Sequence, residues 1–152
     1  MRLTEPDNEL SGSGLTPKPR FLGYHADTER QIFLLTSESL AAEFVMPNCN
    51  GGHFNCFCAM DATALTADEL GGFCSRLLRL GCACLCAWGP DCERVHDIMD
   101  EQVIGGNPPW TEEMGCVMTT WHADDSLTDA LYFSSTAPIQ TRTTHPRAAD
   151  PR

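Results

Sequence analysis

The chain has 152 residues, of which 42% are hydrophobic and 20% are charged, proportions that are ordinary for one soluble globular domain. Its 21 acidic residues outnumber the 10 Lys and Arg residues, so the formal net charge is −11. Such a negative protein repels phosphate backbones and anionic lipids, and we therefore expect no nucleic-acid or membrane partner. An acidic surface instead suits divalent cations or a partner protein with a basic surface.

Nine cysteines in a short chain would suggest disulfides in a secreted protein, but other features disagree. The N-terminus lacks the apolar core of a signal peptide, and no run approaches the roughly 18 apolar residues of a membrane span. We therefore expect a cytoplasmic protein with free thiols. Because cysteines alternate with other residues at Cys56 and Cys58, and at Cys82, Cys84 and Cys86, each set is expected on one face of a strand, as small buried hydrophobic side chains.

Both ends of the chain are predicted to lie outside the folded domain. Residues 1–20 are rich in Gly, Ser and Pro, and residues 139–152 are similarly polar. Such stretches cannot bury enough apolar surface to offset the entropy cost of ordering them. We expect a flexible N-terminal arm over residues 1–20, a single domain over residues 21–138 and a flexible C-terminal tail over residues 139–152.

The predicted domain alternates between strand and helix patterns. Short apolar runs predict strands over residues 30–36, 53–60, 82–88 and 116–121. Residues 40–46 fit either a short helix or an extended segment. The run at 82–88 stops at a Gly-Pro turn and leads into an acidic amphipathic pattern, which is the kind of junction where open α/β sheets hold ligands.

Three helices are predicted among these strands. Thr66 and Glu69 form a capping box ahead of apolar residues at helical spacing, and Gly81 is the expected C-terminal cap. A second helix is expected to begin with Pro90 at its first position, and a third follows Ser126. The short connections predict an α/β fold with three layers, α/β/α, around a mainly parallel sheet of four to five strands, Rossmann-like or flavodoxin-like.

Carboxylates follow the predicted strands. In an open parallel sheet, ligands bind beyond the carboxyl ends of the strands, where the strand order reverses. Asp61, Asp91 and Asp124 lie at such ends, and Glu38 follows the first strand in the same way. The three aspartates are therefore the predicted ligands of a Mg²⁺ ion. They also fit an ordinary place near helix N-termini, where a negative charge is stabilising by roughly 0.3–1 kcal/mol.

Two histidines and one cysteine are candidates for catalysis. His122 ends the fourth predicted strand and is the predicted general acid or base, with Asp91 as the second predicted catalytic residue. His96 and Cys92 share one predicted helix and are weaker candidates, because the apolar pattern points Cys92 inward. The chain contains no G-x-G-x-x-G, Walker A, G-x-S-x-G or H-E-x-x-H motif, so a dinucleotide, ATP or zinc-protease function has no support.

Three segments together resemble a family of short, uncharacterised bacterial proteins. They are Trp88-Gly-Pro-Asp-Cys-Glu-Arg-Val-His-Asp-Ile98, Val117-Met-Thr-Thr-Trp-His122 and Asp124-Asp-Ser-Leu-Thr-Asp-Ala-Leu-Tyr-Phe133. The resemblance covers about the C-terminal third to half of the chain. It implies a small bacterial α/β domain and, because that family has no assigned activity, it implies nothing about chemistry.

The leading hypothesis is a small, acidic, non-catalytic domain that binds a partner protein with a basic surface, as an immunity-type or regulatory protein does. The alternative is a Mg²⁺-dependent phosphohydrolase or phosphoryl-transfer enzyme that uses the strand-end carboxylates and His122, with no cofactor other than magnesium. A third possibility is a small ligand held against two tryptophans. The predicted binding residues are Trp88, Trp121, Asp97, Asp100 and Glu101.

Overall fold

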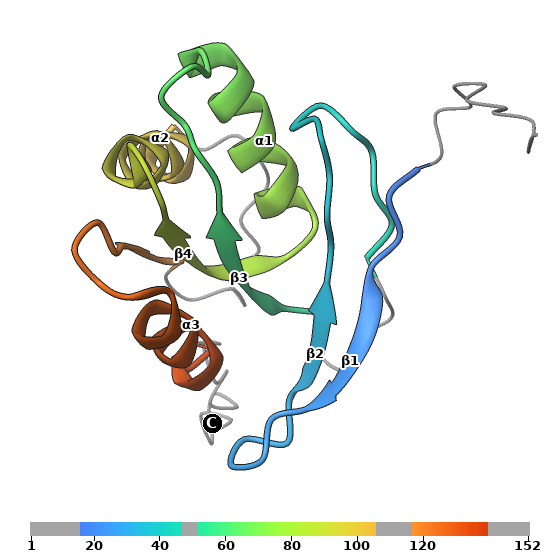
Figure 1. The fold of residues 1–152 in the computed structure, drawn as a ribbon. Helices are drawn as coiled ribbons and strands as arrows, with labels where there is room; N and C mark the ends of the chain where they lie inside the picture. Colours follow the sequence, from blue (N-terminus) through green and yellow to red (C-terminus); the bar gives the residue numbers. More distant parts are fainter. Residues whose placement is uncertain (1–15, 47–51, 106–116, 140–152) are drawn as a thin grey trace, which may run out of the picture.

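The structure is a computed structural model that describes residues 16–46, 52–105 and 117–139. Figure 1 shows a small sheet with helices on both faces and a separate two-stranded ribbon beside it. Most of the predicted flexible arm and tail lies outside the described residues. Residues 40–46, which fitted either helix or strand, form neither.

The sheet contains three parallel strands, β3 (Phe54–Ala59), β4 (Cys82–Trp88) and β5 (Met118–Trp121). Their order is β3-β4-β5, with β4 buried in the centre. These strands confirm three of the four strand predictions and the parallel arrangement. However, each strand pairs with the next one in sequence, so the strand order does not reverse within the described residues. The ligand crevice expected at a reversal therefore has no counterpart there.

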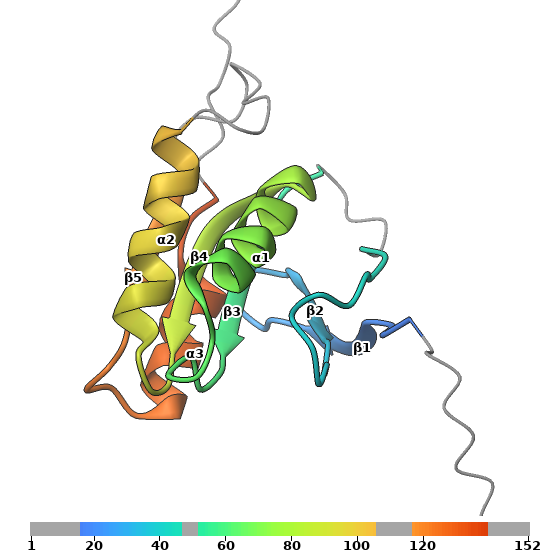
Figure 2. The ribbon, with the colours of Figure 1, turned by 90° about the horizontal axis from the view of Figure 1, so that it is seen from above.

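The helices are divided between the two faces of this sheet (Figures 1 and 2). Helices α1 (Ala67–Arg79) and α2 (Cys92–Ile104) pack together on one face, and α3 (Leu127–Thr136) covers β3 and β4 on the other. Right-handed crossovers that advance in one direction place their helices on the same face, which explains the pairing of α1 and α2. No described helix is long and apolar enough to cross a membrane.

Local sequence signals explain where α1 begins and ends. Thr66 and Glu69 form the predicted capping box, and Gly81 adopts a left-handed φ of 96° just after the C-cap residue. Helix α2 begins later than predicted, because Pro90 lies before the helix rather than at its first position. The N-cap is Asp91, whose φ of 61° is incompatible with a helix that already started at Pro90.

The ribbon is an antiparallel hairpin of β1 (Arg20–Tyr24) and β2 (Gln31–Leu34). The predicted strand at 30–36 thus exists, but it pairs with β1, which begins at the last residue of the predicted flexible arm. A short turn closes this pairing, with the His25 N–H donating to the Arg30 carbonyl at 2.8 Å. The described sheet consequently has three strands rather than four to five, and Glu38 does not follow one of them.

The two faces of the sheet carry different cores. A large apolar cluster fills the space under α1 and α2, whereas a small cluster around Cys84, Cys86 and Ala137 lies under α3. Cys82 belongs to the large cluster, so it does not share a face with Cys84 and Cys86 as predicted. The reason is an irregularity in β4, since the pairing with β3 skips Ala83.

Candidate functional site

Polar side chains line the α3 face of the sheet. Cys86 of β4 lies directly opposite Thr120 of β5, and Cys84 precedes Cys86 by two residues on the same face. His122 follows Thr120 by two residues, so alternation along the extended chain places it on that face as well. Ser134 of α3 is buried above them. We refer to Cys84, Cys86, Thr120, His122 and Ser134 as the polar cluster.

His122 is held at both of its ring nitrogens. Nδ1 lies 2.6 Å from Asp125 Oδ2, and Nε2 lies 3.1 Å from Thr120 Oγ1. The Trp88 indole N–H donates to the Asp125 carbonyl at 3.0 Å and so fixes the turn that carries the carboxylate. A hydroxyl, an imidazole and a carboxylate in this order match the arrangement of a nucleophile, a general base and the group that orients the base.

Most of the polar cluster is nevertheless closed to solvent, and only Thr120 in it is half-buried. His122 is 9% exposed and packs against Phe133, with ring centroids 5.1 Å apart. Cys84 and Cys86 are fully buried. Any chemistry on a substrate would therefore require α3 to move first. In the described conformation, the hydrogen bonds of the cluster hold α3 and the turn before it on the sheet.

Cys86 differs in acidity from the thiols under α1 and α2. Every cysteine that the structure describes is free. Under α1 and α2, burial raises the pKa of Cys74 to about 12, and burial also raises the pKa of the neighbouring thiols. On the α3 face, a hydrogen bond with the Cys84 thiol lowers the pKa of Cys86 against the effect of burial, and hydroxyls of the polar cluster lower it further. Cys86 thus differs from these thiols, because its hydrogen bonds favour the charged form.

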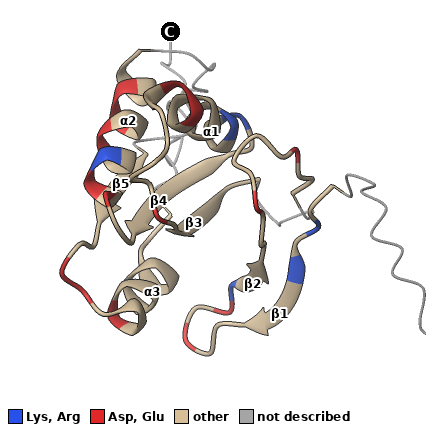
Figure 3. Ribbon diagram, turned by 45° about the horizontal axis from the view of Figure 1, so that its top comes forward, with Lys and Arg blue, Asp and Glu red and all other residues tan. Residues whose placement is uncertain are grey.

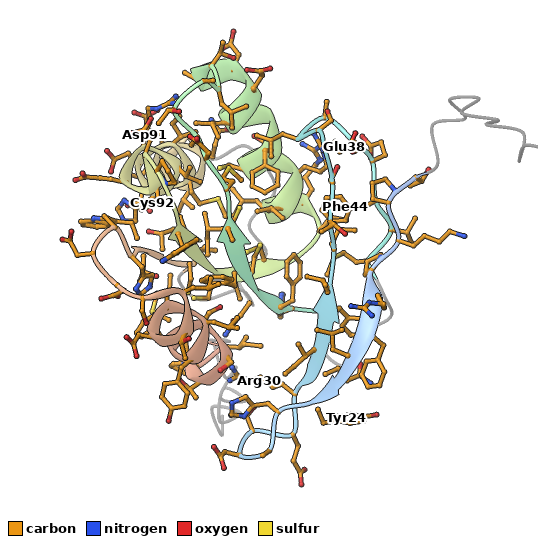
Figure 4. The ribbon with its side chains drawn as sticks, in the orientation of Figure 1. Tyr24, Arg30, Glu38, Phe44, Asp91 and Cys92 are labelled. Atoms are coloured by element: carbon orange, nitrogen blue, oxygen red, sulfur yellow. The ribbon has the colours of Figure 1, made fainter. Side chains whose placement is uncertain are left out.

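The three predicted magnesium ligands have separate environments. Hydrogen bonds from the Thr63 hydroxyl at 2.6 Å and backbone N–H at 3.0 Å lower the pKa of Asp61. Asp91, at the start of α2 (Figure 4), accepts from Arg94 Nε at 2.6 Å. Asp124 is exposed in the turn before α3. Among the residues that the structure describes, no group of three or more His, Cys, Asp or Glu residues could hold a metal ion.

The predicted catalytic pair of His122 and Asp91 is not formed. The carboxylate at His122 belongs to Asp125, whereas Asp91 pairs with Arg94. Cys92, the weaker nucleophile candidate, is buried in the large core as its apolar pattern predicted. None of His122, Asp91 and Cys92 is therefore an exposed catalytic side chain that works together with another of the three.

Some of the predicted binding residues on α2 lie near Trp121 of β5. The Trp121 ring is 44% exposed, and its centroid lies 4.5 Å from that of His96. The His96 ring in turn lies near two carboxylates, with Nδ1 3.0 Å from Asp97 Oδ1 and Nε2 3.6 Å from Asp100 Oδ2. Glu101 is exposed on the same helix, and Figure 3 shows the concentration of acidic residues along α2. We call these five residues the acidic α2 surface.

The two predicted pocket tryptophans lie on opposite faces of the sheet. Trp88 reaches the turn before α3 through its bond to Asp125, whereas Trp121 stacks on His96 of α2. Their rings therefore do not form two walls of one pocket. A small ligand held between them, the third possibility from the sequence, has no matching geometry.

Sequence reasoning missed Thr120, Ser134 and the role of Asp125. The signal for Thr120 was its i, i+2 spacing from His122 on a predicted strand, which places both on one face. Asp125 lies next to Asp124 in the sequence, but it was not predicted as the partner of His122. Ser134 carried no local signal, because a serine in a helix is expected to face solvent unless the helix packs in an unusual orientation.

Comparisons with known proteins identify the family but no activity. No curated protein and no solved structure matches the chain. A family model described as a domain of unknown function, DUF7684, matches residues 31–148. The match begins at β2 and includes all three segments that carried the resemblance to an uncharacterised family. Because this model spans well over half of the sequence, the chain belongs to the DUF7684 family.

Proposed function

We propose that this domain binds a partner protein carrying a basic, amphipathic segment, and that the outer face of α3 receives that segment. The observation that supports the proposal is the reversed amphipathicity of α3. Its buried residues are Ala130 and Ser134, whereas Leu127, Leu131 and Tyr132 are exposed, the last two by 50% and 64%. A surface helix normally turns its large apolar side chains toward the core, and a contiguous exposed apolar face is typical of an interaction site.

The charges around this face favour a basic partner. Asp124 and Asp125 precede α3 and Asp129 lies in its first turn, all exposed. Residues 117–139 contain no Lys or Arg. A basic segment would gain attraction to this acidic rim, whereas a second copy of a chain with net charge −11 would meet like charges.

The apolar surface extends toward the hairpin. Phe21 and Tyr24 of β1 are exposed, and their rings lie edge to face at a centroid distance of 5.3 Å. Arg30 ties the hairpin to the end of α3 by donating to the carbonyls of Ser135 at 3.3 Å and Ala137 at 2.6 Å (Figure 4). Arg30 thus anchors the hairpin, with its exposed aromatic side chains, to the end of α3.

The acidic α2 surface supports the same class of partner. An exposed Trp121 ring beside the carboxylates of Asp97 and Asp100 suits a Lys or Arg side chain, through cation–π contact and ion pairing. Free thiols suit the reducing cytoplasm, where we propose that the protein acts in an immunity-type or regulatory role.

The proposal is tested by titrating the protein with defined helical peptides in a calorimeter. The first peptide has one Leu face and one Lys face, the second has Glu in place of Lys, and the third has Ser in place of Leu. We expect binding of the Leu/Lys peptide alone, because the α3 face requires both apolar contact and positive charge. Equal binding of the Leu/Glu peptide, or of the Ser/Lys peptide, would contradict the proposal.

Matched variants locate the binding site. Leu131→Ser and Asp124→Lys are expected to weaken binding by at least about tenfold, or about 1.4 kcal/mol. Ile104→Ser removes an 85% exposed apolar side chain from the end of α2, and Glu43→Lys reverses an exposed charge elsewhere. Both controls are expected to leave binding unchanged. A Leu131→Ser variant that binds as tightly as the wild type would place the site elsewhere.

A further inference from the structure

Two cysteine thiols are in contact on the α3 face of β4. Cys84 and Cys86 are separated by one residue, and their Sγ atoms lie 3.7 Å apart. Both are fully buried and belong to the same small cluster. Alternation along a strand places two such side chains on one face, but the irregularity at Ala83 also bends β4 beside the pair.

The surroundings activate one thiol of the pair. The two thiols share a hydrogen bond, and the pKa of Cys84 is raised whereas that of Cys86 is lowered. The hydroxyls of Thr120 and Ser134 and the ring of His122 support the thiolate form of Cys86. A thiolate attacks electrophiles, while a neighbouring thiol can resolve the product. The pair thus has an attacking sulfur and a resolving sulfur in contact.

The cover over the pair is weakly anchored. Of the residues of α3, only Ala130 and Ser134 are buried, and neither is a large apolar side chain. Burial of apolar area sets the cost of local opening, so α3 is expected to open more readily than α1, which buries five residues including Phe73 and three leucines. Transient opening of α3 gives a small oxidant access to Cys84 and Cys86.

We propose that Cys84 and Cys86 are a redox modification site that forms a reversible disulfide with peroxides. The Cys86 thiolate attacks a peroxide oxygen, the O–O bond breaks, and the leaving hydroxide takes a proton from solvent, giving water and a Cys86 sulfenic acid. The Cys84 sulfur then attacks the Cys86 sulfur, the S–O bond breaks, and the leaving hydroxide takes the Cys84 proton as a second water. The two sulfurs are oxidised by two electrons and the peroxide is reduced.

This disulfide is expected to be strained and to loosen α3. Residues i and i+2 of a strand have Cα atoms about 6.6 Å apart, near the upper end of the range for disulfides, and the Cβ atoms must approach to about 3.8 Å. Strained disulfides are reduced easily. Oxidation also removes the Cys86 sulfur from its hydrogen bonds with Thr120 and Ser134, which link β4, β5 and α3. The inference does not depend on the proposed partner.

The test exposes the full native chain to hydrogen peroxide, alkylates the remaining thiols and digests the protein with trypsin. The tryptic peptide 80–94 contains Cys82, Cys84, Cys86 and Cys92. We expect Cys84 and Cys86 to lose alkylation together, with the mass loss of two hydrogens, and dithiothreitol to restore both. Unchanged alkylation of this pair, while other cysteines become oxidised, would overturn the proposal. The wild-type result decides this point without any variant.

Cysteine variants show which sulfur attacks the peroxide and which one resolves the sulfenic acid. Cys86→Ser is expected to abolish the product, and Cys84→Ser is expected to leave Cys86 as a sulfenic acid that dimedone traps. The matched control is Cys58→Ser in the pair Cys56 and Cys58, which has the same spacing on β3 but raised pKa values. This control is expected to leave the product unchanged. An unaltered yield in Cys86→Ser would overturn the assignment, and circular dichroism checks that each variant is folded.

Discussion

The two faces of the β3-β4-β5 sheet are covered by different kinds of side chain. Under α1 and α2 lie large apolar side chains such as Leu70, Leu77 and Met99, all nearly or fully buried. Under α3 the fully buried side chains are small or polar, including Ser134 and His122, and Phe57 and Met118 are partly buried beside them. Because apolar burial supplies most folding free energy, the first face is expected to stabilise the domain. On the second face, directional hydrogen bonds fix the position of α3 with little burial of apolar surface.

The orientation of α3 follows from this difference. A helix that packs on small and polar side chains must turn Ala130 and Ser134 toward the sheet, so its large apolar residues remain outside. The large apolar side chains of α1 are buried, whereas those of α3 are exposed. We infer that α1 and α2 form the scaffold and that α3 is the element that responds to partners and oxidants.

The largest difference is expected between truncating a leucine on α1 and truncating a leucine on α3. Leu77 of α1 is 2% exposed, and Leu77→Ala is expected to lower the free energy of unfolding by about 2–5 kcal/mol, because it removes buried contacts and leaves a cavity. Leu131→Ala on α3 is expected to change it by less than about 0.5 kcal/mol. Urea unfolding of both variants measures the difference. Equal losses would mean that the outer face of α3 is buried in the folded protein.

The next largest effect is expected from His122→Ala. This change leaves the Asp125 carboxylate and the Thr120 hydroxyl without their shared partner, at an expected cost of about 1–3 kcal/mol. Hydrogen exchange measured by mass spectrometry should show faster exchange in α3, with α1 unchanged, because the lost bonds connect only the α3 side. Faster exchange throughout the domain would show that the two faces are not separate in stability.

The comparison also explains which parts of the fold the sequence predicted. Helix α1 and strands β3 and β4 were predicted because their large apolar residues and the Thr66 capping box lie next to one another in sequence. The hairpin was not predicted, because Arg20–Tyr24 follows a Gly- and Pro-rich stretch and has a bulge that breaks its alternation. The absence of a strand-order reversal is a property of pairing between distant segments, which no local pattern encodes.

The site was predicted less well than the fold. His122 was singled out at the end of β5, but the second catalytic residue was predicted to be Asp91, whereas the carboxylate beside His122 is that of Asp125, three residues away. The assumption of a crevice between strands favoured distant carboxylates over a local turn. The contact between Cys84 and Cys86 agrees with the alternation predicted for this strand, whereas the position of Ser134 depends on the packing of α3 and has no local signal.

A smaller effect is expected from removing the two helix caps. Thr66→Ala breaks the capping box of α1 and is expected to cost about 1 kcal/mol. Ser126→Ala removes the corresponding bond to the Asp129 N–H at 3.2 Å and is expected to cost less, because α3 contributes less to global stability. Thermal unfolding of both variants measures this difference. A larger loss of stability in Ser126→Ala than in Thr66→Ala would contradict the assignment of α1 as scaffold and of α3 as the responsive helix.

Acid should weaken the α1 cap. The backbone N–H and hydroxyl of Thr66 donate to the Glu69 carboxylate and lower its pKa from the usual 4.5. A lowered pKa in the folded state contributes stability that is present above pH 4.5 and lost as the pH falls through the folded-state value. Glu69→Gln should therefore be less stable than the wild type at neutral pH. This difference in stability should shrink as the pH falls below 4.5. A constant gap would exclude the carboxylate as its cause.

The smallest effect, no change, is expected when millimolar Mg²⁺ is added to the protein. A ligand that binds only the folded state raises the melting temperature, so a cation site would be visible in a thermal melt. Asp61 and Asp91 are each bonded to a different neighbour, and Asp124 lies exposed in the turn before α3. Among the described residues, no group of three or more His, Cys, Asp or Glu side chains could hold a metal ion. A rise in melting temperature that both Asp91→Asn and Asp124→Asn abolish would mean that the carboxylates following β4 and β5 converge on a metal, and it would favour the phosphohydrolase alternative over partner binding.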